Sequence, residues 1–222
     1  MTRGACSSVS TGRSRELAVG SVPCTALRVT YVGELGWELY CPMEFAPRLW
    51  DELWAAGREH GLVAGGYRAI DSLRLEKGYR VWGADVTPDE TPYEAGLGFA
   101  VKLDKATSSG REALVGAAEP ERRLCCLVLA DPRSVVLGSE PVRVEGEIVG
   151  RVTSGGYGYT VERSIAYAYL LAPGAEVGTP VEARPRLIGG APPQRHPSVA
   201  SPLAVNRDHA AGHFRDVAHE SQ

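Results

Sequence analysis

Hydrophobic and polar residues alternate in two segments near the N-terminus, one on each side of a glycine-containing turn. The first segment covers residues 26–31 and the second covers residues 37–41. Alternation at period two, with β-branched and aromatic residues, is typical of strands. Pro42 ends the second segment because it cannot donate a hydrogen bond to a sheet. The pattern predicts a hairpin whose turn is residues 32–36.

A helical pattern follows this hairpin. Residues 44–60 carry apolar side chains at three-to-four spacing, which predicts an amphipathic helix. Pro47 falls in its first turn, where a missing N–H costs nothing, and Gly61 provides the stop. The four tryptophans lie in or near this region, so we expect the first core to be built there: Trp37, Trp50, Trp54 and Trp82.

A second helix is predicted over residues 67–77, with Gly78 as its stop. Its inward positions are expected to be Ile70, Leu73 and Leu75. After it, prolines and glycines indicate loops. A short strand over residues 99–103 and a short helix over residues 110–115 are predicted within this stretch.

The pattern changes to short strands beyond residues 119 and 120, where we place a domain boundary. Glycine-containing turns separate these strands roughly every ten residues, which is typical of a small barrel or sandwich. The predicted strands are residues 124–129, 141–144, 147–153, 164–171 and 180–183.

The two ends of the chain lack this patterning. Residues 1–16 are rich in Arg, Ser and Thr, which is weakly similar to a transit peptide, but a disordered start is the preferred interpretation. Residues 189–222 are rich in proline and histidine and predict a disordered tail. A frameshifted C-terminus and an accessory tail both explain its composition.

Composition places the chain among globular proteins. Of its 222 residues, 44% are hydrophobic and 23% are charged, with a net charge of −3. This charge argues against a nucleic-acid partner, and no apolar run approaches the roughly 20 residues of a membrane span. The five cysteines form no C-x-x-C pair, which favours free thiols in a cytoplasmic location. Cys125 and Cys126 are adjacent in a predicted strand and should point to opposite faces.

The turn of the first hairpin is the strongest candidate site. Tyr31 and Glu38 flank it on facing strands, so both side chains can reach one pocket. A tyrosine offers an aromatic face, and a carboxylate accepts two parallel N–H bonds, which suits a flat polar heterocycle. The spacing of the two residues alone favours the alternative interpretation, in which both side chains lie on the surface of a sheet and bind no ligand.

The second predicted helix carries the other charged cluster. Arg68 and Ser72 share one helix face, as do Asp71 and Arg74. An arginine near the helix start could hold a carboxylate, but a charged helix face with ion pairs is the favoured alternative. The His209 and His213 spacing fits metal binding, yet no third ligand is near and we predict no metal site. No residue can be assigned as nucleophile, general acid or general base.

The order of several longer motifs resembles one family. The motifs are YVGELGWE, then GGYRAIDSLRLEKGYRVWGADVTPDETPYEAGLGFAVKLDK, then RVTSGGYGYTVERSIAYAYL. They resemble the tetrahydrofolate-binding aminomethyltransferases, the glycine cleavage T-protein and its relatives. EKGYRVWGAD and PYEAGLGFAVKLDK are most similar to the folate half of dimethylglycine and sarcosine oxidases and dehydrogenases. The resemblance covers about residues 17–188.

The resemblance implies folate-binding residues. The family's tyrosine and final glutamate of Y-x-G-E-x-G-x-E contact the pterin, and they match Tyr31 and Glu38. Ile70 occupies the position of the family's folate-binding arginine. We assign the role of that arginine to Arg68, two positions earlier, although two positions rotate a side chain by about 200° around the helix axis. Trp82 is expected to line the pocket as an apolar wall.

The resemblance also implies a fold class, α+β, with a partial aminomethyltransferase-type folate-binding domain over residues 17–119. A small antiparallel β-barrel follows over residues 120–188. The family's N-terminal half, with its catalytic aspartate, has no counterpart in residues 1–16. The chain is therefore expected to be the C-terminal portion of the unit, and either to need a complementing N-terminal or flavin-domain chain or to be poorly stable.

The implied activity is transfer of a one-carbon unit from an amine to tetrahydrofolate, giving 5,10-methylenetetrahydrofolate. The donor stays open among a glycine-derived amine, sarcosine and dimethylglycine. FAD is expected only if a flavin domain lies on a partner or upstream chain. The alternatives are a non-catalytic folate-binding module and an inactive fragment. One kind of non-catalytic folate-binding relative is linked to iron–sulfur cluster assembly and carries the motif K-G-C-Y-x-G-Q. The segment that begins at Lys77 lacks the cysteine of this motif, so this alternative ranks lower.

Overall fold

The computed structural model describes residues 12–105, 109–131, 134, 136–171 and 174–183, and the backbone of residues 197–202. The chain forms two compact units, one ending at Ile70 and the other beginning at Asp71. Among the described residues, no helix has the length and apolar character needed to cross a membrane.

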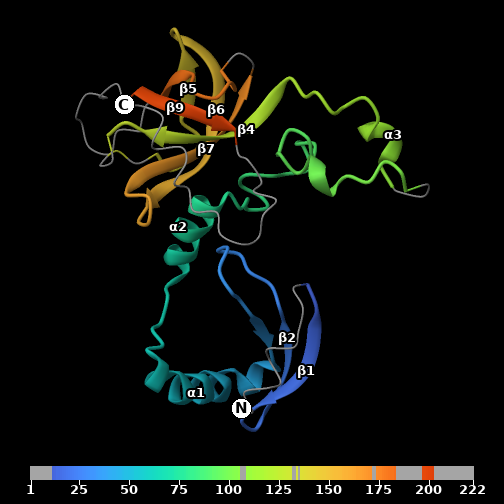
Figure 1. The fold of residues 1–222 in the computed structure, drawn as a ribbon, viewed down its shortest axis with the longest axis vertical. Helices are drawn as coiled ribbons and strands as arrows, with labels where there is room; N and C mark the ends of the chain where they lie inside the picture. Colours follow the sequence, from blue (N-terminus) through green and yellow to red (C-terminus); the bar gives the residue numbers. More distant parts are fainter. Residues whose placement is uncertain are drawn as a thin grey trace. The chain divides into compact units, whose positions relative to one another are not determined.

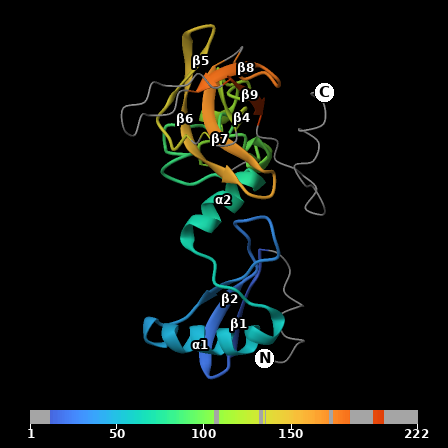
Figure 2. The same ribbon diagram turned by 90° about the vertical axis from the view of Figure 1, so that its left-hand side faces the viewer.

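The first unit contains a three-stranded antiparallel sheet in the order β1-β2-β3 (Figure 1). Strands β1 (Ser14–Val19) and β2 (Val22–Leu27) form a hairpin, and β3 (Glu38–Tyr40) pairs with β2 at its edge. Strand β1 begins within the range for which disorder was predicted. Helix α1 (Ala46–Gly57) crosses one face of this sheet (Figure 2).

The core of this unit lies between the sheet and α1. It is formed by Val19, Val22, Cys24 and Leu49, with Leu39 and Leu53 packed against it among others. The tryptophans do not build this core as predicted. Trp50 is 57% exposed and stacks on Trp54 at 5.7 Å between ring centroids. Trp50 follows Leu49 directly, and neighbouring positions of a helix face different directions, so burying Leu49 turns Trp50 outward.

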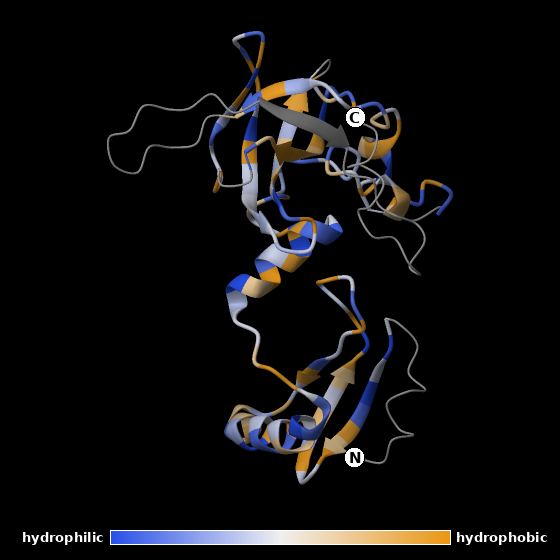
Figure 3. Ribbon diagram, turned by 60° about the vertical axis from the view of Figure 1, so that its left-hand side comes forward, coloured by the Kyte–Doolittle hydropathy of each residue, from blue (hydrophilic) through white to orange (hydrophobic). Residues whose placement is uncertain are grey.

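The predicted helix over residues 44–60 is present as three consecutive segments. The 3₁₀ turns η1 (Met43–Phe45) and η2 (Arg58–His60) flank α1. Gly61 ends the segment with φ of 73°, a left-handed conformation that glycine adopts without strain. The second predicted helix is confirmed as α2 (Tyr67–Lys77), in which hydrophobic and hydrophilic positions alternate (Figure 3).

The second unit is built on a closed antiparallel barrel with the strand order β4-β7-β6-β5-β8-β9. This confirms the small barrel predicted from the spacing of strands and turns. Its last strand falls within the tail that was predicted to be disordered; His209 and His213 lie outside the described residues. The strands are β4 (Arg122–Leu129), β5 (Pro141–Val144), β6 (Glu147–Gly158), β7 (Arg163–Leu171), β8 (Pro180–Ala183) and β9 (Pro197–Pro202).

The barrel wall is buried on both sides at strand β4, as the adjacent cysteines predicted. Cys125 belongs to the cluster inside the barrel, with Leu127 and Leu170 among others. Cys126 belongs to a second cluster, on the outer side, which includes Leu75 of α2 and Tyr167 of β7. Helix α2 therefore covers part of the outer surface of the barrel.

Several local predictions differ from the structure. Strand β6 continues to Gly158, beyond the predicted end at residue 153. Residues 99–103 were predicted to be a strand, but the segment holds the 3₁₀ turn η3 (Gly98–Ala100). The short helix is limited to α3 (Arg111–Leu114). In α2 the buried residues are Arg74, Leu75 and Glu76. Of the predicted inward positions only Leu75 is buried, because the helix meets the barrel through polar side chains as well as through leucine; Ile70 and Leu73 are 39% and 40% exposed.

Candidate functional site

The candidate site of the first unit lies where the chain leaves β2 and returns in β3. The predicted pairing of these segments is confirmed, with Leu27 opposite Glu38. The first strand was predicted in the wrong place, because β2 covers Val22–Leu27 rather than residues 26–31. The prediction that Tyr31 and Glu38 lie on facing strands is therefore wrong: Tyr31 lies in the connecting loop, residues 28–37, which is longer than the predicted turn. Glu38 is the first residue of β3, directly after this loop.

Arg28 closes the loop at its base. Its Nη1 atom donates a hydrogen bond to the carbonyl oxygen of Gly36 at 2.7 Å, and its guanidinium lies 5.1 Å from the centroid of the Trp37 ring. The backbone N–H of Arg28 donates to the carbonyl of Arg13 at 2.9 Å, which ties the same residue to the sheet. The base of the loop is thus held by one arginine.

Gly36 lets the two sides of the loop approach each other. A Cβ atom at this position would lie 2.5 Å from the carbonyl oxygen of Val29, closer than any side chain tolerates. The short contact leaves room only for a hydrogen atom. Glycine is therefore required here by packing.

The two residues proposed to contact a pterin are both accessible. Tyr31 is 38% exposed and Glu38 is exposed. The hydroxyl of Tyr40 donates a hydrogen bond to Oε2 of Glu38 at 2.5 Å. This bond and the negative charge of Glu38 raise the pKa of Tyr40, so its hydroxyl stays protonated as a donor at neutral pH.

Arg68 and Trp82 are exposed as well. Arg68 lies in the first turn of α2, two positions before Ile70. Trp82 is 72% exposed and lies in the second unit, in a turn closed by a hydrogen bond from the N–H of Asp85 to the carbonyl of Val81 at 2.8 Å. Folate contacts of these two residues stay predictions.

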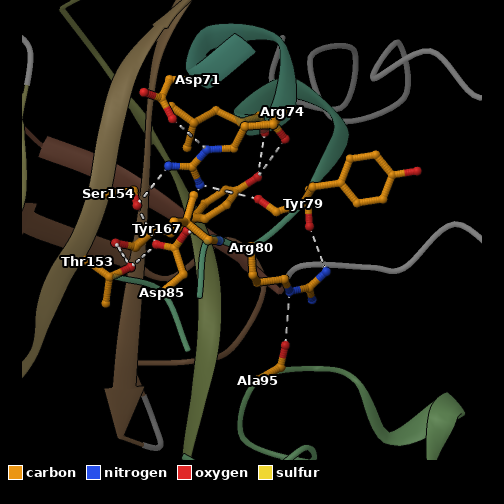
Figure 4. Close-up of polar contacts among 12 residues, drawn as sticks. Asp71, Arg74, Tyr79, Arg80, Asp85, Ala95, Thr153, Ser154 and Tyr167 are labelled. Carbon is orange, nitrogen blue, oxygen red and sulfur yellow. Dashed lines mark hydrogen bonds and ion pairs between the residues drawn. The ribbon is translucent and has the colours of Figure 1, made fainter. Parts of the chain in front are cut away.

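A buried polar network in the second unit was not predicted (Figure 4). Nη1 of Arg74 lies 2.6 Å from Oδ2 of Asp85, and both side chains are almost fully buried. Nη2 of Arg74 donates to the hydroxyl of Ser154 at 3.0 Å, and Nε lies 3.5 Å from Asp71. The Asp71–Arg74 pair was expected from helix spacing; the stronger partner Asp85 was not.

Asp85 accepts hydrogen bonds on both carboxylate oxygens. Oδ1 accepts from the hydroxyls of Thr153 and Ser154 on β6, and Oδ2 also accepts from the N–H of Val81 at 3.0 Å. The backbone carbonyl of Asp85 accepts from the hydroxyl of Tyr169 at 2.9 Å. The side chain therefore fastens the turn that carries Trp82 to the outer surface of the barrel.

Other contacts hold the end of α2 to the same surface. The hydroxyl of Tyr167 donates to the carbonyl of Leu75 at 2.6 Å, and burial raises the pKa of this tyrosine. Oε1 of Glu76 accepts from the N–H of Thr160 at 2.6 Å. These donors and acceptors serve the fold, and they explain why charged residues of α2 are buried.

Neither the Arg74–Asp85 pair nor the Glu38–Tyr40 pair was identified from sequence. Asp85 follows Arg74 by eleven residues, in a loop, so no periodicity connects them. Tyr40 could have been found, because residues two apart on a strand share a face. Among the described residues, no cluster of three His, Cys, Asp or Glu could hold a metal ion.

Comparison with known families matches almost the whole patterned region. The model of the GCVT N-terminal domain matches residues 4–105, and the model of the glycine cleavage T-protein C-terminal barrel domain matches residues 122–190. The chain belongs to the glycine cleavage T-protein, or aminomethyltransferase, family. The fold is α+β with the family's C-terminal antiparallel barrel, as expected.

The relatives include both dehydrogenases and aminomethyltransferases. The chain is 42% identical to human dimethylglycine dehydrogenase over 77% of this chain and 20% of the relative. It is 44% identical to human sarcosine dehydrogenase over 67% of this chain and 16% of the relative. It is 41% identical to the aminomethyltransferase of Symbiobacterium thermophilum over 76% of this chain and 46% of the relative.

A solved structure supports the same assignment. The glycine cleavage system aminomethyltransferase T from Bartonella henselae matches with a TM-score of 0.74 and 28% identity. The match covers 90% of this chain and 54% of that protein. The chain thus spans about half the length of the matched aminomethyltransferases and about a fifth of the dehydrogenases.

Proposed function

We propose that this chain binds tetrahydrofolate and belongs to a protein that transfers a one-carbon unit from an amine to that cofactor. Membership of the aminomethyltransferase family supports the reaction class. The observation that carries the proposal is the position of Glu38. Its exposed carboxylate lies where the loop of residues 28–37 ends and β3 begins. This position is within the segment that the family model matches.

The side chains of the first unit suit a pterin. Its amino group and adjacent ring N–H are two parallel donors, and a carboxylate is the acceptor that matches them. Glu38 presents such a carboxylate, and Tyr31 presents a partly exposed aromatic ring from the neighbouring loop. In the proposed site Glu38 binds the polar edge of the pterin, and Tyr31 contacts its ring.

Arg68 and Trp82 are each proposed to contact the folate. Arg68 is an exposed cation suited to a carboxylate of the glutamyl tail. Trp82 offers an exposed aromatic surface suited to an apolar wall. Bound tetrahydrofolate supplies the amine that accepts the one-carbon unit. These residues contribute by holding and orienting that amine and by excluding water from it.

The donor proposed for the whole protein is a methylated or glycine-derived amine. The relatives include dimethylglycine dehydrogenases, sarcosine dehydrogenases and aminomethyltransferases, whose names support this class. FAD enters the proposal only through a flavin domain on a partner or preceding segment. A cytoplasmic location is also a proposal, based on the free thiols Cys24, Cys41, Cys125 and Cys126.

The test is calorimetric titration of the purified chain with 5-formyltetrahydrofolate, a stable reduced folate. Saturable binding with one folate per chain is expected, and heat no different from dilution would contradict the proposal. A transfer assay with a methylene donor then separates an enzyme from a non-catalytic folate-binding module. A module binds folate but produces no 5,10-methylenetetrahydrofolate, whereas an inactive fragment does neither.

A further inference from the structure

Strand β3 places two polar side chains on one face of the sheet. Glu38 and Tyr40 are exposed, whereas Leu39 between them packs against the core with α1 on the other face. Successive side chains of a strand point to opposite faces, so residues two apart lie side by side. Pairing with β2 at Leu27 and Thr25 fixes this register.

The contact between Glu38 and Tyr40 constrains the carboxylate. The phenol donates to Oε2 at 2.5 Å, the distance of a strong hydrogen bond to an ionised acceptor. A carboxylate has acceptor sites for about four hydrogen bonds, two on each oxygen. One phenol donor therefore fixes the orientation of the group and still leaves both oxygens able to accept further donors.

We propose that Tyr40 is a positioning residue of the folate site, whose hydroxyl holds the Glu38 carboxylate in the orientation that receives the two N–H donors of the pterin. This inference rests on the proposed function. An exposed glutamate samples many rotamers, and it must lose that freedom when a ligand binds. A side chain already held in place loses less, so the ligand binds more tightly.

The position of Tyr40 makes its role separable from folding. Its side chain is 55% exposed, and replacement by phenylalanine keeps the ring on the strand while removing only the hydroxyl. The expected consequence of Tyr40→Phe is a loss of folate affinity of about two- to tenfold, the range for one hydrogen bond. The thermal melting curve should stay that of the unmodified chain.

The experiment is a double-mutant cycle measured by calorimetric titration with 5-formyltetrahydrofolate. The chains compared are the unmodified chain, Tyr40→Phe, Glu38→Ala and the double variant. Because Tyr40 acts through Glu38, its substitution should weaken binding when Glu38 is present and have no further effect when it is absent. Tyr159→Phe is the matched control, since Tyr159 is also exposed, at 75%, and lies in the other unit.

The outcomes separate this inference from the proposed function. If Glu38→Ala loses affinity while Tyr40→Phe binds like the unmodified chain, the site stands and the role of Tyr40 is overturned. A loss on Tyr40→Phe that is equal in both backgrounds also overturns it, because Tyr40 would then act without Glu38. If the unmodified chain does not bind, or Glu38→Ala binds normally, the proposed function itself fails and the inference fails with it.

Discussion

Arg74 and Asp85 form a buried ion pair, with 2.6 Å between Nη1 and Oδ2. Arg74 comes from helix α2 and Asp85 from the turn that carries Trp82. Asp85 also accepts from the hydroxyls of Thr153 and Ser154 on β6. One pair of residues thus connects a helix, a loop and the barrel of the second unit.

This pair joins the segment that follows Asp71 to the barrel unit. The family models separate the chain between residues 105 and 122, whereas the compact units divide between Ile70 and Asp71. The hydrogen bonds of Asp85 hold the turn that carries Trp82 against the barrel. This turn precedes residue 105 and so belongs to the segment that the first family model matches. The segment from Asp71 therefore packs as part of the barrel unit although it matches the first family model.

The first prediction concerns the free energy of unfolding of this unit. Asp85→Asn keeps the size of the side chain but removes the buried charge partner of Arg74. Only Asp71 remains, which is half-exposed and lies 3.5 Å from Nε of Arg74. Breaking a buried ion pair on one side costs about 3–5 kcal/mol. We expect a loss of about that size, measured by scanning calorimetry, which resolves the two units if they melt separately.

The control for Asp85→Asn is an ion pair of the same length on the surface. Arg48 and Glu52 are also 2.6 Å apart, but Arg48 is 62% exposed. Because solvent screens such a pair, Arg48→Gln should cost at most about 1 kcal/mol. Equal effects of the two substitutions would show that the Arg74–Asp85 pair does not hold the unit together.

The second prediction concerns the shape of the loop formed by residues 28–37, in which we propose folate to bind. Gly36→Ala places a Cβ atom 2.5 Å from the carbonyl oxygen of Val29 and forces the loop open. The hydrogen bond from Arg28 to Gly36 is then lost. Tyr31 and Glu38 lose their relative placement, so folate affinity should fall at least about tenfold, since misplacement of binding groups is costly.

Gly65→Ala is the control for this substitution. An added Cβ atom at Gly65 meets nothing within 4 Å, and its conformation is open to other residues. The variant should bind folate like the unmodified chain. Titration of both variants is the measurement, and unchanged affinity of Gly36→Ala would contradict the loop assignment.

The third prediction concerns alkaline stability. Burial raises the pKa of Cys125 to about 11 and that of Cys126 to about 12, from an ordinary value of 9.0. Above pH 9 the unfolded chain releases these thiol protons while the folded chain retains them. The free energy of unfolding must therefore fall by about 1.4 kcal/mol per pH unit for each thiol, from pH 9 to about pH 11 for Cys125 and from pH 9 to about pH 12 for Cys126.

A variant without the two thiols tests this assignment. Cys125→Ala combined with Cys126→Ala loses packing at every pH, but its unfolding free energy should fall less steeply between pH 9 and pH 11. Urea unfolding of both chains at several pH values measures the two slopes. Equal slopes would mean that the thiols do not contribute to the pH dependence.

Sequence patterns predicted the elements best where a local signal was complete. Helix α2 and strands β5 and β8 have the expected bounds, because a glycine stop or a glycine turn marks their ends. The short alternation over residues 99–103 predicted a strand wrongly, since so few residues also fit a 3₁₀ turn followed by a loop. The strand predicted over residues 26–31 was misplaced in the same way, because its alternation continues into the loop after β2 (Val22–Leu27).

Contacts between distant segments could not be predicted from periodicity. Arg74 lies on a helix whose charges looked like a solvated face, and only the folded barrel supplies Ser154 and Tyr167 beside it. The candidate site shows the same limit. The motif identified Tyr31 and Glu38, but the clamp by Arg28 and the hydrogen bond from Tyr40 depend on the fold.

The central claim is that the Glu38 carboxylate binds the polar edge of a folate. Its most direct test is titration of Glu38→Ala with 5-formyltetrahydrofolate, beside Glu44→Ala, which removes an exposed glutamate outside the loop. Loss of charge-assisted hydrogen bonds should weaken binding by at least about tenfold for Glu38→Ala. Glu44→Ala should bind like the unmodified chain. Equal affinities of Glu38→Ala and the unmodified chain would contradict the account.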